Sequence, residues 1–256
     1  FVDIFEQVVK VMFDAQNTEK QAALVIIERF RRHEMAYNRS LEIMQLSKDA
    51  NTRFVAARIL EAVVQEKWRI LGPDNQARIK GHTQRILARL VADAKVYAAH
   101  KELVTKLNGI IVAIAKHDWP AKWPTFIQDM VKASAENDVV CRNTLDIIKR
   151  LSEEVFDYSK NNLTSKKVVD LKKQLHKELR AIFTLCMMKL SSCFEATGQG
   201  LPIYFLSVCC KTIPSPSSSH DGLKCRCQAR LHRFCFAGVG PVSTSHSLDS
   251  CTNRIP

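Results

Sequence analysis

The chain has 256 residues, of which 46% are hydrophobic, so it is long enough to bury a substantial core. Its formal net charge of +12 leaves anionic partners open, but Lys and Arg are mostly interleaved with Glu and Asp, which is typical of solvated helix faces. No apolar stretch approaches the ~20 residues of a membrane-spanning helix. The acidic, amphipathic start from Phe1 to Phe13 does not resemble a secretory signal. We therefore expect a piece of a cytosolic or nuclear protein without a membrane anchor.

Two capping-box spacings predict where the first helices begin. Asp3 is followed three residues later by Glu6, and Thr18 by Gln21. In a capping box the first side chain accepts a bond from a backbone N–H and the second reaches back to the cap residue. Helices are expected to start at both places.

Apolar residues then recur at three-to-four spacing, which predicts helix after helix up to Thr197. The later helices are expected at about 35–47, 51–70, 103–114, 138–158 and 164–193. Gly72-Pro73 separates two of them, because Gly tolerates a left-handed closing turn and Pro suits a first helical turn. The second helices of successive pairs begin near Thr18, Asn51, Ala99 and Asp138, a period of roughly 40 residues.

This period predicts an all-α fold, a HEAT-repeat α-solenoid of about five helical pairs over residues 1–197. A single pair cannot bury its own apolar faces, so neighbouring pairs stack. One helix of every pair then lines the inner face of the solenoid, which is a large surface for binding another protein.

Residues 198–256 have a different composition, rich in Ser, Cys, Pro and Gly and without a helical or strand period. We expect this tail to be disordered, because it offers little apolar surface to offset the entropy of ordering. It resembles a gene-model or frameshift product more than a continuation of the repeats.

Catalytic and metal-binding patterns are absent from the sequence. It has no phosphate-binding Gly-rich loop, no His-Glu-x-x-His pair and no nucleophile elbow, so we expect no enzyme activity and no cofactor. The tail contains Cys225-Arg226-Cys227, but the two-residue spacing of paired zinc ligands is missing, and no metal site is expected.

Three segments carry a resemblance to a known family. They run from Asn51 to Leu71, from Lys106 to Ile127 and from Leu151 to Ser159, and the second contains Asp118-Trp119-Pro120-Ala121-Lys122-Trp123-Pro124. In order and spacing they resemble the amino-terminal repeats of the exportin-1 family of nuclear export receptors, within the karyopherin (importin-β) superfamily. Pro120 is expected to end one helix and Pro124 to start the next. Trp119, Trp123 and Phe156 are then expected to cover the core.

The resemblance implies that the second helices of the first repeats bind the small GTPase Ran in its GTP form. The polar candidates for this contact are Asn51, Arg53, Glu61, Gln65, Lys106 and Asn108. It also implies shuttling between nucleus and cytoplasm, contact with nuclear pore proteins, and export cargo bound through repeats beyond this chain. Neither a membrane nor nucleic acid is an expected partner. Another karyopherin, an RNA-binding solenoid and a scaffold indifferent to Ran remain as alternatives.

Overall fold

The computed structural model describes residues 1–14, 18–135, 137–156 and 164–197. Within these ranges the chain forms ten α-helices and one 3-10 turn and no strand, which confirms the all-α prediction. None of these helices is both long and apolar enough to cross a membrane. In chain order the elements are α1 (Val2–Phe13), α2 (Lys20–Arg32), α3 (Ala36–Leu46), α4 (Ala50–Lys67), the turn η1 (Trp68–Ile70), α5 (Pro73–Val91), α6 (Ala94–Ala99), α7 (Lys101–Asp118), α8 (Phe126–Ala133), α9 (Asp138–Phe156) and α10 (Ser165–Thr197).

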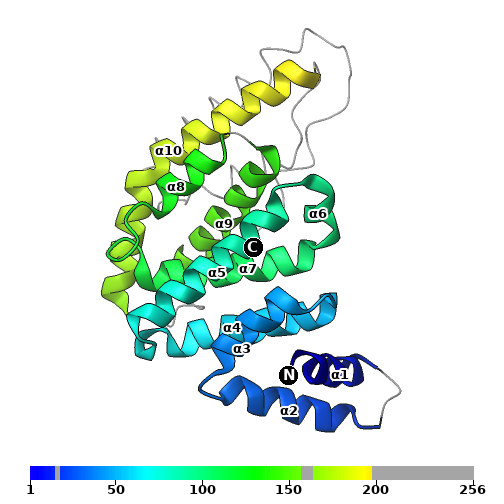
Figure 1. Ribbon diagram of the computed structural model, residues 1–256. Helices are drawn as coiled ribbons and strands as arrows, with labels where there is room; N and C mark the ends of the chain where they lie inside the picture. The colour runs from blue at the N-terminus through cyan, green and yellow to red at the C-terminus, as the bar shows by residue number, and fades with distance from the viewer. Residues whose placement is uncertain (15–17, 136, 157–163, 198–256) are drawn as a thin grey trace, which may run out of the picture.

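The helices pair and stack as a HEAT solenoid. α1 packs on α2, α3 on α4, α5 on α7 and α8 on α9, while the short α6 connects α5 to α7. Figure 1 shows the stack rising from α1 and α2 at the bottom to α10 at the top. The described residues thus form four pairs and the long helix α10, which packs along α8 and α9.

The helix boundaries follow the sequence closely, but the two predicted capping boxes are wrong. α1 and α2 begin within two residues of the expected places, yet their N-cap residues are Phe1 and Glu19 and neither side chain makes a capping bond. Asp3 instead lies in the first turn of α1, where a negative charge complements the helix dipole. Side-chain caps occur at Asp49, which accepts from the Thr52 amide at 2.7 Å, and at Asp93. Neither cap was among the sequence-based predictions.

The Gly72-Pro73 boundary is confirmed, although not by the expected backbone conformation. Pro73 is the first residue of α5, as its fixed φ favours. Gly72 has φ −59° and ψ 156°, so it is extended and not left-handed. A side chain at Gly72 would meet no atom within 4 Å. Glycine is therefore not required at this turn by its conformation or by crowding.

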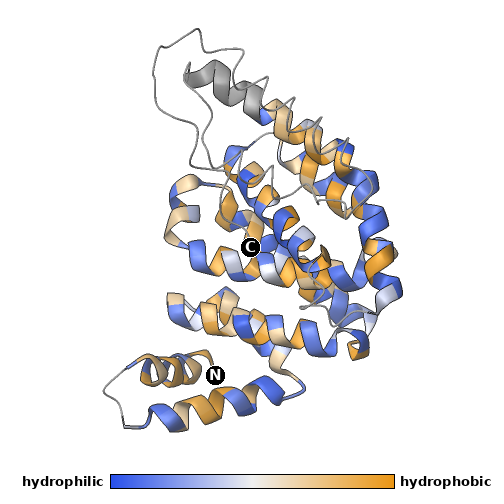
Figure 2. Cartoon of the chain, turned by 180° about the vertical axis from the view of Figure 1, so that it is seen from behind, coloured by the Kyte–Doolittle hydropathy of each residue, from blue (hydrophilic) through white to orange (hydrophobic). Residues whose placement is uncertain are grey.

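The core is deepest around α7, which lies between α4, α5 and α9. Its apolar side chains from Leu103 to Ala115 are almost completely buried, including Leu107 and Ile110 at 0% exposure. α2 differs, since Ala23 is its only buried residue. In Figure 2 the apolar residues occupy the middle of α2 and polar residues occupy both ends. Burial thus increases from the first helix pair towards the middle of the stack.

The turn between α7 and α8 has the predicted architecture except at Pro124. α7 ends at Asp118, and Trp119 and Trp123 are buried at 0% and 8% exposure. Both rings contact Phe126, with centroids 6.2 and 4.6 Å away, and the Trp119–Pro120 peptide is cis. Pro124 lies two residues before α8 and does not open it. The two tryptophans close the core at this corner.

Phe156, the remaining aromatic candidate, is the last residue of α9. It packs partly buried against the core, and the Lys172 ammonium lies 4.9 Å from its ring centroid. Its structural role is therefore to join the end of α9 to α10. The predicted disorder of residues 198–256 lies outside the described residues, as does the end of the third resemblance segment.

Candidate protein-binding surface

Four helices, the second members of their pairs, form a continuous layer. We call α2, α4, α7 and α9 the second-helix row, because each contacts the next. An ion pair joins each helix of the row to the next. Ion pairs that are in contact with solvent contribute only about 0.2–1 kcal/mol each. The bridges are therefore a sign of a charged, partly solvated surface more than a source of stability. They join Arg31 to Glu66 at 2.7 Å, Lys106 to Glu61 at 3.1 Å and Lys116 to Glu154 at 2.8 Å.

Two of the six predicted contact residues lie exposed at opposite ends of α4. Asn51 is in its first turn and Gln65 in its last. At 1.5 Å per residue, the fourteen-residue separation corresponds to about 21 Å along the helix axis. The amides of Asn51 and Gln65 therefore lie at the two ends of a surface long enough for a protein partner. They are too far apart to bind one small ligand together.

Glu61 and Lys106 are the only two of the six candidates that the structure joins by an ion pair within its described part. They are 18% and 29% exposed and connect α4 to α7. The helices approach closely here, because a Cβ on Gly109 would collide with the Glu61 carboxylate. Glycine at position 109 therefore makes room for the ion pair.

Arg53 is half-buried on α4, and its buried Nε atom has no hydrogen-bond partner among the described residues. Burial lowers the pKa of its guanidinium. An uncompensated, partly desolvated cation of this kind would interact favourably with an acidic group on a partner.

Asn108 lies elsewhere than expected, because it is only 3% exposed. Its Nδ2 donates to Oδ1 of Asn143 at 2.8 Å, so the two amides connect α7 to α9 inside the molecule. Here Asn108 offers a partner no exposed polar group. Helical spacing alone could not predict the burial of Asn108. Its polar amide favours an exposed position, although the residue lies on the buried side of α7.

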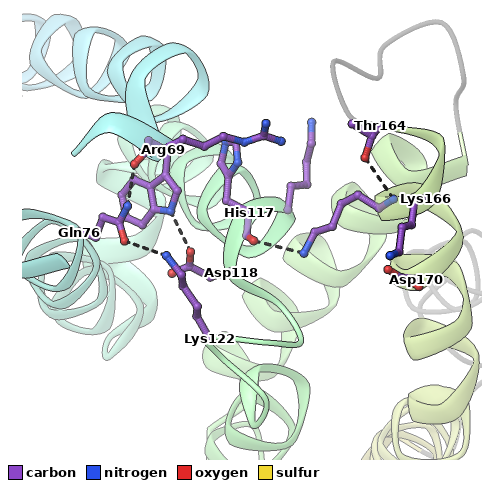
Figure 3. Close-up of a pocket in the computed structure, with 11 residues that line it drawn as sticks. Arg69, Gln76, His117, Asp118, Lys122, Thr164, Lys166 and Asp170 are labelled. Carbon is purple, nitrogen blue, oxygen red and sulfur yellow. Dashed lines mark hydrogen bonds between the residues drawn. The ribbon is translucent and has the colours of Figure 1, made fainter. Parts of the chain in front are cut away.

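Sequence reasoning missed a polar junction at the far end of α7. Trp68 Nε1 donates to the buried Asp118 carboxylate at 2.8 Å. Lys167 Nζ, from α10, donates to the backbone carbonyls of His117 and Trp119 at 3.2 and 2.6 Å. Figure 3 shows His117 and Asp118 of this junction in the lining of a cavity. The Trp119-Pro120 motif lies at this junction. Its partners Trp68 and Lys167 are distant in the sequence, and no local pattern relates them to the motif.

No group of three or more His, Cys, Asp or Glu side chains that could hold a metal ion occurs in the described ranges. The cysteines described there, Cys141 and Cys186, are both buried and form no disulfide.

Comparison with known proteins gives a consistent result. Residues 22–84 match the family described as importin-beta N-terminal domain, and residues 100–221 match the family described as exportin 1-like protein. Exportin-1 of Drosophila melanogaster is 36% identical over 196 residues, covering 76% of this chain and 18% of the relative. Protein EXPORTIN 1A of Arabidopsis thaliana is 32% identical over 192 residues, 75% of this chain and 18% of the relative. Exportin-1 of Schizosaccharomyces pombe is 30% identical over 185 residues, 72% of this chain and 17% of the relative.

The fold and the matched domains define a karyopherin of the importin-β type, built from HEAT-like helical repeats. Within that class, the chain belongs to the exportin-1 family and corresponds to its amino-terminal region. It spans about a fifth of the length of the curated relatives it matches. The exportin match extends to residue 221, past the compositional change predicted at 197.

Proposed function

We propose that this chain is the Ran-binding part of a nuclear export receptor and that the second-helix row contacts Ran in its GTP form. The observation that carries the proposal is the charged second-helix row, in which α4 and all but the first two residues of α2 lie within the matched importin-beta N-terminal domain. In this proposal the chain binds other proteins and performs no catalysis. It shuttles between nucleus and cytoplasm and contacts nuclear pore proteins on the way.

The proposed contact residues are those that offer a polar group on the row. Asn51 and Gln65 are exposed, and Arg53, Glu61 and Lys106 are part-exposed. Asn108 serves the contact indirectly, by holding α7 against α9.

The proposed mechanism is coupled binding. Ran in its GTP form and an export cargo each stabilise the same curved conformation of the receptor, so each raises the affinity for the other. Cargo binds through repeats that this chain does not contain. Hydrolysis of GTP, performed by Ran, then releases both.

Binding of the 256-residue chain to Ran tests the proposal. We expect a clear preference for Ran loaded with a non-hydrolysable GTP analogue over Ran loaded with GDP. Equal binding to both forms, or no binding by a chain that circular dichroism shows to be folded, would contradict it. RNA binding that weakens steeply with salt would instead support the RNA-binding alternative.

A pair of matched double variants tests the surface. Asn51→Ala with Gln65→Ala removes the two exposed amides of α4, and we expect about fivefold weaker binding to the GTP form, which corresponds to about 1 kcal/mol. Gln45→Ala with Gln84→Ala changes two exposed amides on α3 and α5, outside the row, and should leave binding unchanged. If both variants behave alike, the second-helix row is not the contact surface.

A further inference from the structure

A basic cavity lies where the end of α7 meets the starts of α5 and α10. Its volume is about 380 Å³, within the ~300–1,000 Å³ of small-ligand sites. In Figure 3, Arg69, Gln76 and Lys122 lie on one side, Thr164, Lys166 and Asp170 on the other, and His117 between them. Its charged lining consists of five basic side chains and two carboxylates, namely Arg69, Lys116, Lys122, Lys166 and Lys167 with Asp118 and Asp170.

Part of this charge is already compensated within the molecule. Lys116 pairs with Glu154 at 2.8 Å, and Lys167 donates to two backbone carbonyls. The Asp118 carboxylate is buried at 4% exposure and accepts from Trp68. These groups form the fixed inner wall of the cavity.

The outer cations are different. Arg69 and Lys166 are exposed, and neither has a hydrogen bond or ion pair from its side chain within the described part of the chain. Lys122 is also exposed, and its ammonium makes one long hydrogen bond, 3.4 Å to Oε1 of Gln76. Within the described residues, three cations therefore surround the mouth of the cavity without a carboxylate partner.

The pKa values of two inner-wall side chains, His117 and Lys167, are lowered first by burial and then by neighbouring cations. Burial lowers the pKa of His117, and the nearby Arg69, Lys116 and Lys167 lower it further against the opposing effect of Asp118. Burial also lowers the pKa of Lys167, with Arg69 adding to the effect while Asp118 and Asp170 oppose it. An anion in the cavity would relieve this repulsion and favour the charged forms of both side chains.

We propose that this cavity binds an acidic peptide segment of a partner protein, with its carboxylates held by Arg69, Lys122 and Lys166. Three separated cations around one opening suit several carboxylates on a flexible chain. A single arginine gives little of the bidentate geometry that favours phosphate. Trp68 is the one Phe, Tyr or Trp side chain among the lining residues; it is 2% exposed and its ring stacks on that of His117. The cavity therefore offers little of the stacking surface that single-stranded nucleic acid uses.

The cavity borders the surface proposed to contact Ran, because Gln65 precedes Arg69 by four residues and Lys116 belongs both to the cavity lining and to the second-helix row. Lys106, in contrast, precedes Lys116 by ten residues on α7, about 15 Å along the helix axis at 1.5 Å per residue. The acidic peptide is a second ligand with its own binding measurement, which requires no Ran in the experiment.

The experiment uses a fluorescein-labelled hexaglutamate peptide and the 256-residue chain, with hexaglutamine as the neutral control peptide. We expect the triple variant Arg69→Gln, Lys122→Gln, Lys166→Gln to bind hexaglutamate about tenfold more weakly than the unmodified chain. The matched control is Lys48→Gln, Arg58→Gln, Arg89→Gln, which removes the same charge from exposed positions outside the cavity lining. It should bind as the unmodified chain does.

A second measurement needs no variant. In the unmodified chain, the NMR signals of the His117 ring should report a higher pKa when hexaglutamate is bound. Equal weakening in both triple variants, or peptide binding that leaves His117 unchanged, would overturn the proposal, because the attraction would then be general surface charge. Competition by inorganic phosphate or an oligothymidylate at concentrations equal to the peptide would also overturn it, in favour of a phosphate or nucleic-acid site.

Discussion

The first helix pair and the interior around α7 have apolar sequences of similar character but bury them to very different extents. In α2, Leu24, Val25 and Ile26 are 41%, 47% and 50% exposed, whereas Leu107 and Ile110 of α7 are fully buried. α7 packs between α4, α5 and α9, while α2 packs mainly on α1. In a stacked array each helix gains stability from its neighbours, so amphipathic pattern predicts a helix but not how much its burial contributes.

The largest expected effect comes from the same substitution made in both regions. Leu107→Ala should lower the free energy of unfolding by about 3–4 kcal/mol, because it removes a fully buried side chain and leaves a cavity between tightly packed helices. Leu24→Ala should change it by no more than about 0.5 kcal/mol, since Leu24 is already 41% exposed in the folded chain. Urea unfolding followed by circular dichroism measures both. Equal losses at the two positions would show that the end pair is as well packed as the interior.

The next effect probes the polar junction at the end of α7. Asp118→Asn should destabilise the chain by about 1–3 kcal/mol, because the buried carboxylate accepts from Trp68 and opposes the charge of the part-buried Lys167. In the Asp118→Asn background, Lys167→Met should recover part of the lost stability, because it removes the Lys167 cation that has lost the opposing charge of Asp118. If the double variant is no more stable than Asp118→Asn, the two groups are not coupled.

Two part-buried histidines, His117 at this junction and His82 on α5, also predict a dependence of stability on pH. The pKa of His117 is lowered by burial and then by Arg69, and the pKa of His82 is lowered by burial and then by Arg85 and Arg78. The unfolded chain therefore takes up these protons first as the pH falls below about 6.5. Stability present above that pH should be lost as the pH falls towards the folded-state pKa values.

His117→Gln and His82→Gln separate the two contributions. Each should reduce the difference in urea midpoint between pH 7.5 and pH 5.5, because glutamine does not titrate. An unchanged difference in the His117 variant would show that its imidazole is as well solvated in the folded chain as in the unfolded one.

Local pattern predicted the helices well and the contacts between them poorly. The three-to-four spacing located α3, α4, α7, α9 and α10 to within a few residues, because helical amphipathicity is a property of short segments. The Trp-Pro corner was also predictable, since proline limits helices locally. The two capping boxes failed, because spacing alone did not establish that Asp3 or Thr18 precedes its helix as a cap.

The candidate surface shows the same limit. Glu61 and Lys106 were both chosen for their polarity, but their ion pair joins residues 45 apart, which the sequence does not relate. Asn108 was chosen for the same reason and is buried against Asn143. The charged cavity combines Arg69, Lys122 and Lys166 from three separate elements, so only the stacking of the repeats could reveal it.

At Gly109 two opposing terms nearly cancel, so the expected net effect of a substitution is small. Alanine in a helix interior is favoured over glycine by about 1 kcal/mol. Against this, the new Cβ would displace the Glu61 carboxylate and weaken its part-exposed pair with Lys106, a loss of about 0.2–1 kcal/mol. Gly109→Ala should therefore change the free energy of unfolding by less than about 1 kcal/mol in either direction.

A double-mutant cycle turns this small value into a sharp test. In a Glu61→Ala background the obstacle and the ion pair are both absent, so Gly109→Ala should stabilise the chain by about 1 kcal/mol. The difference between the two backgrounds measures how firmly Glu61 is held between α4 and α7. If Gly109→Ala has the same effect in both, the carboxylate rearranges at no cost, and the close approach of α4 and α7 does not require glycine at position 109.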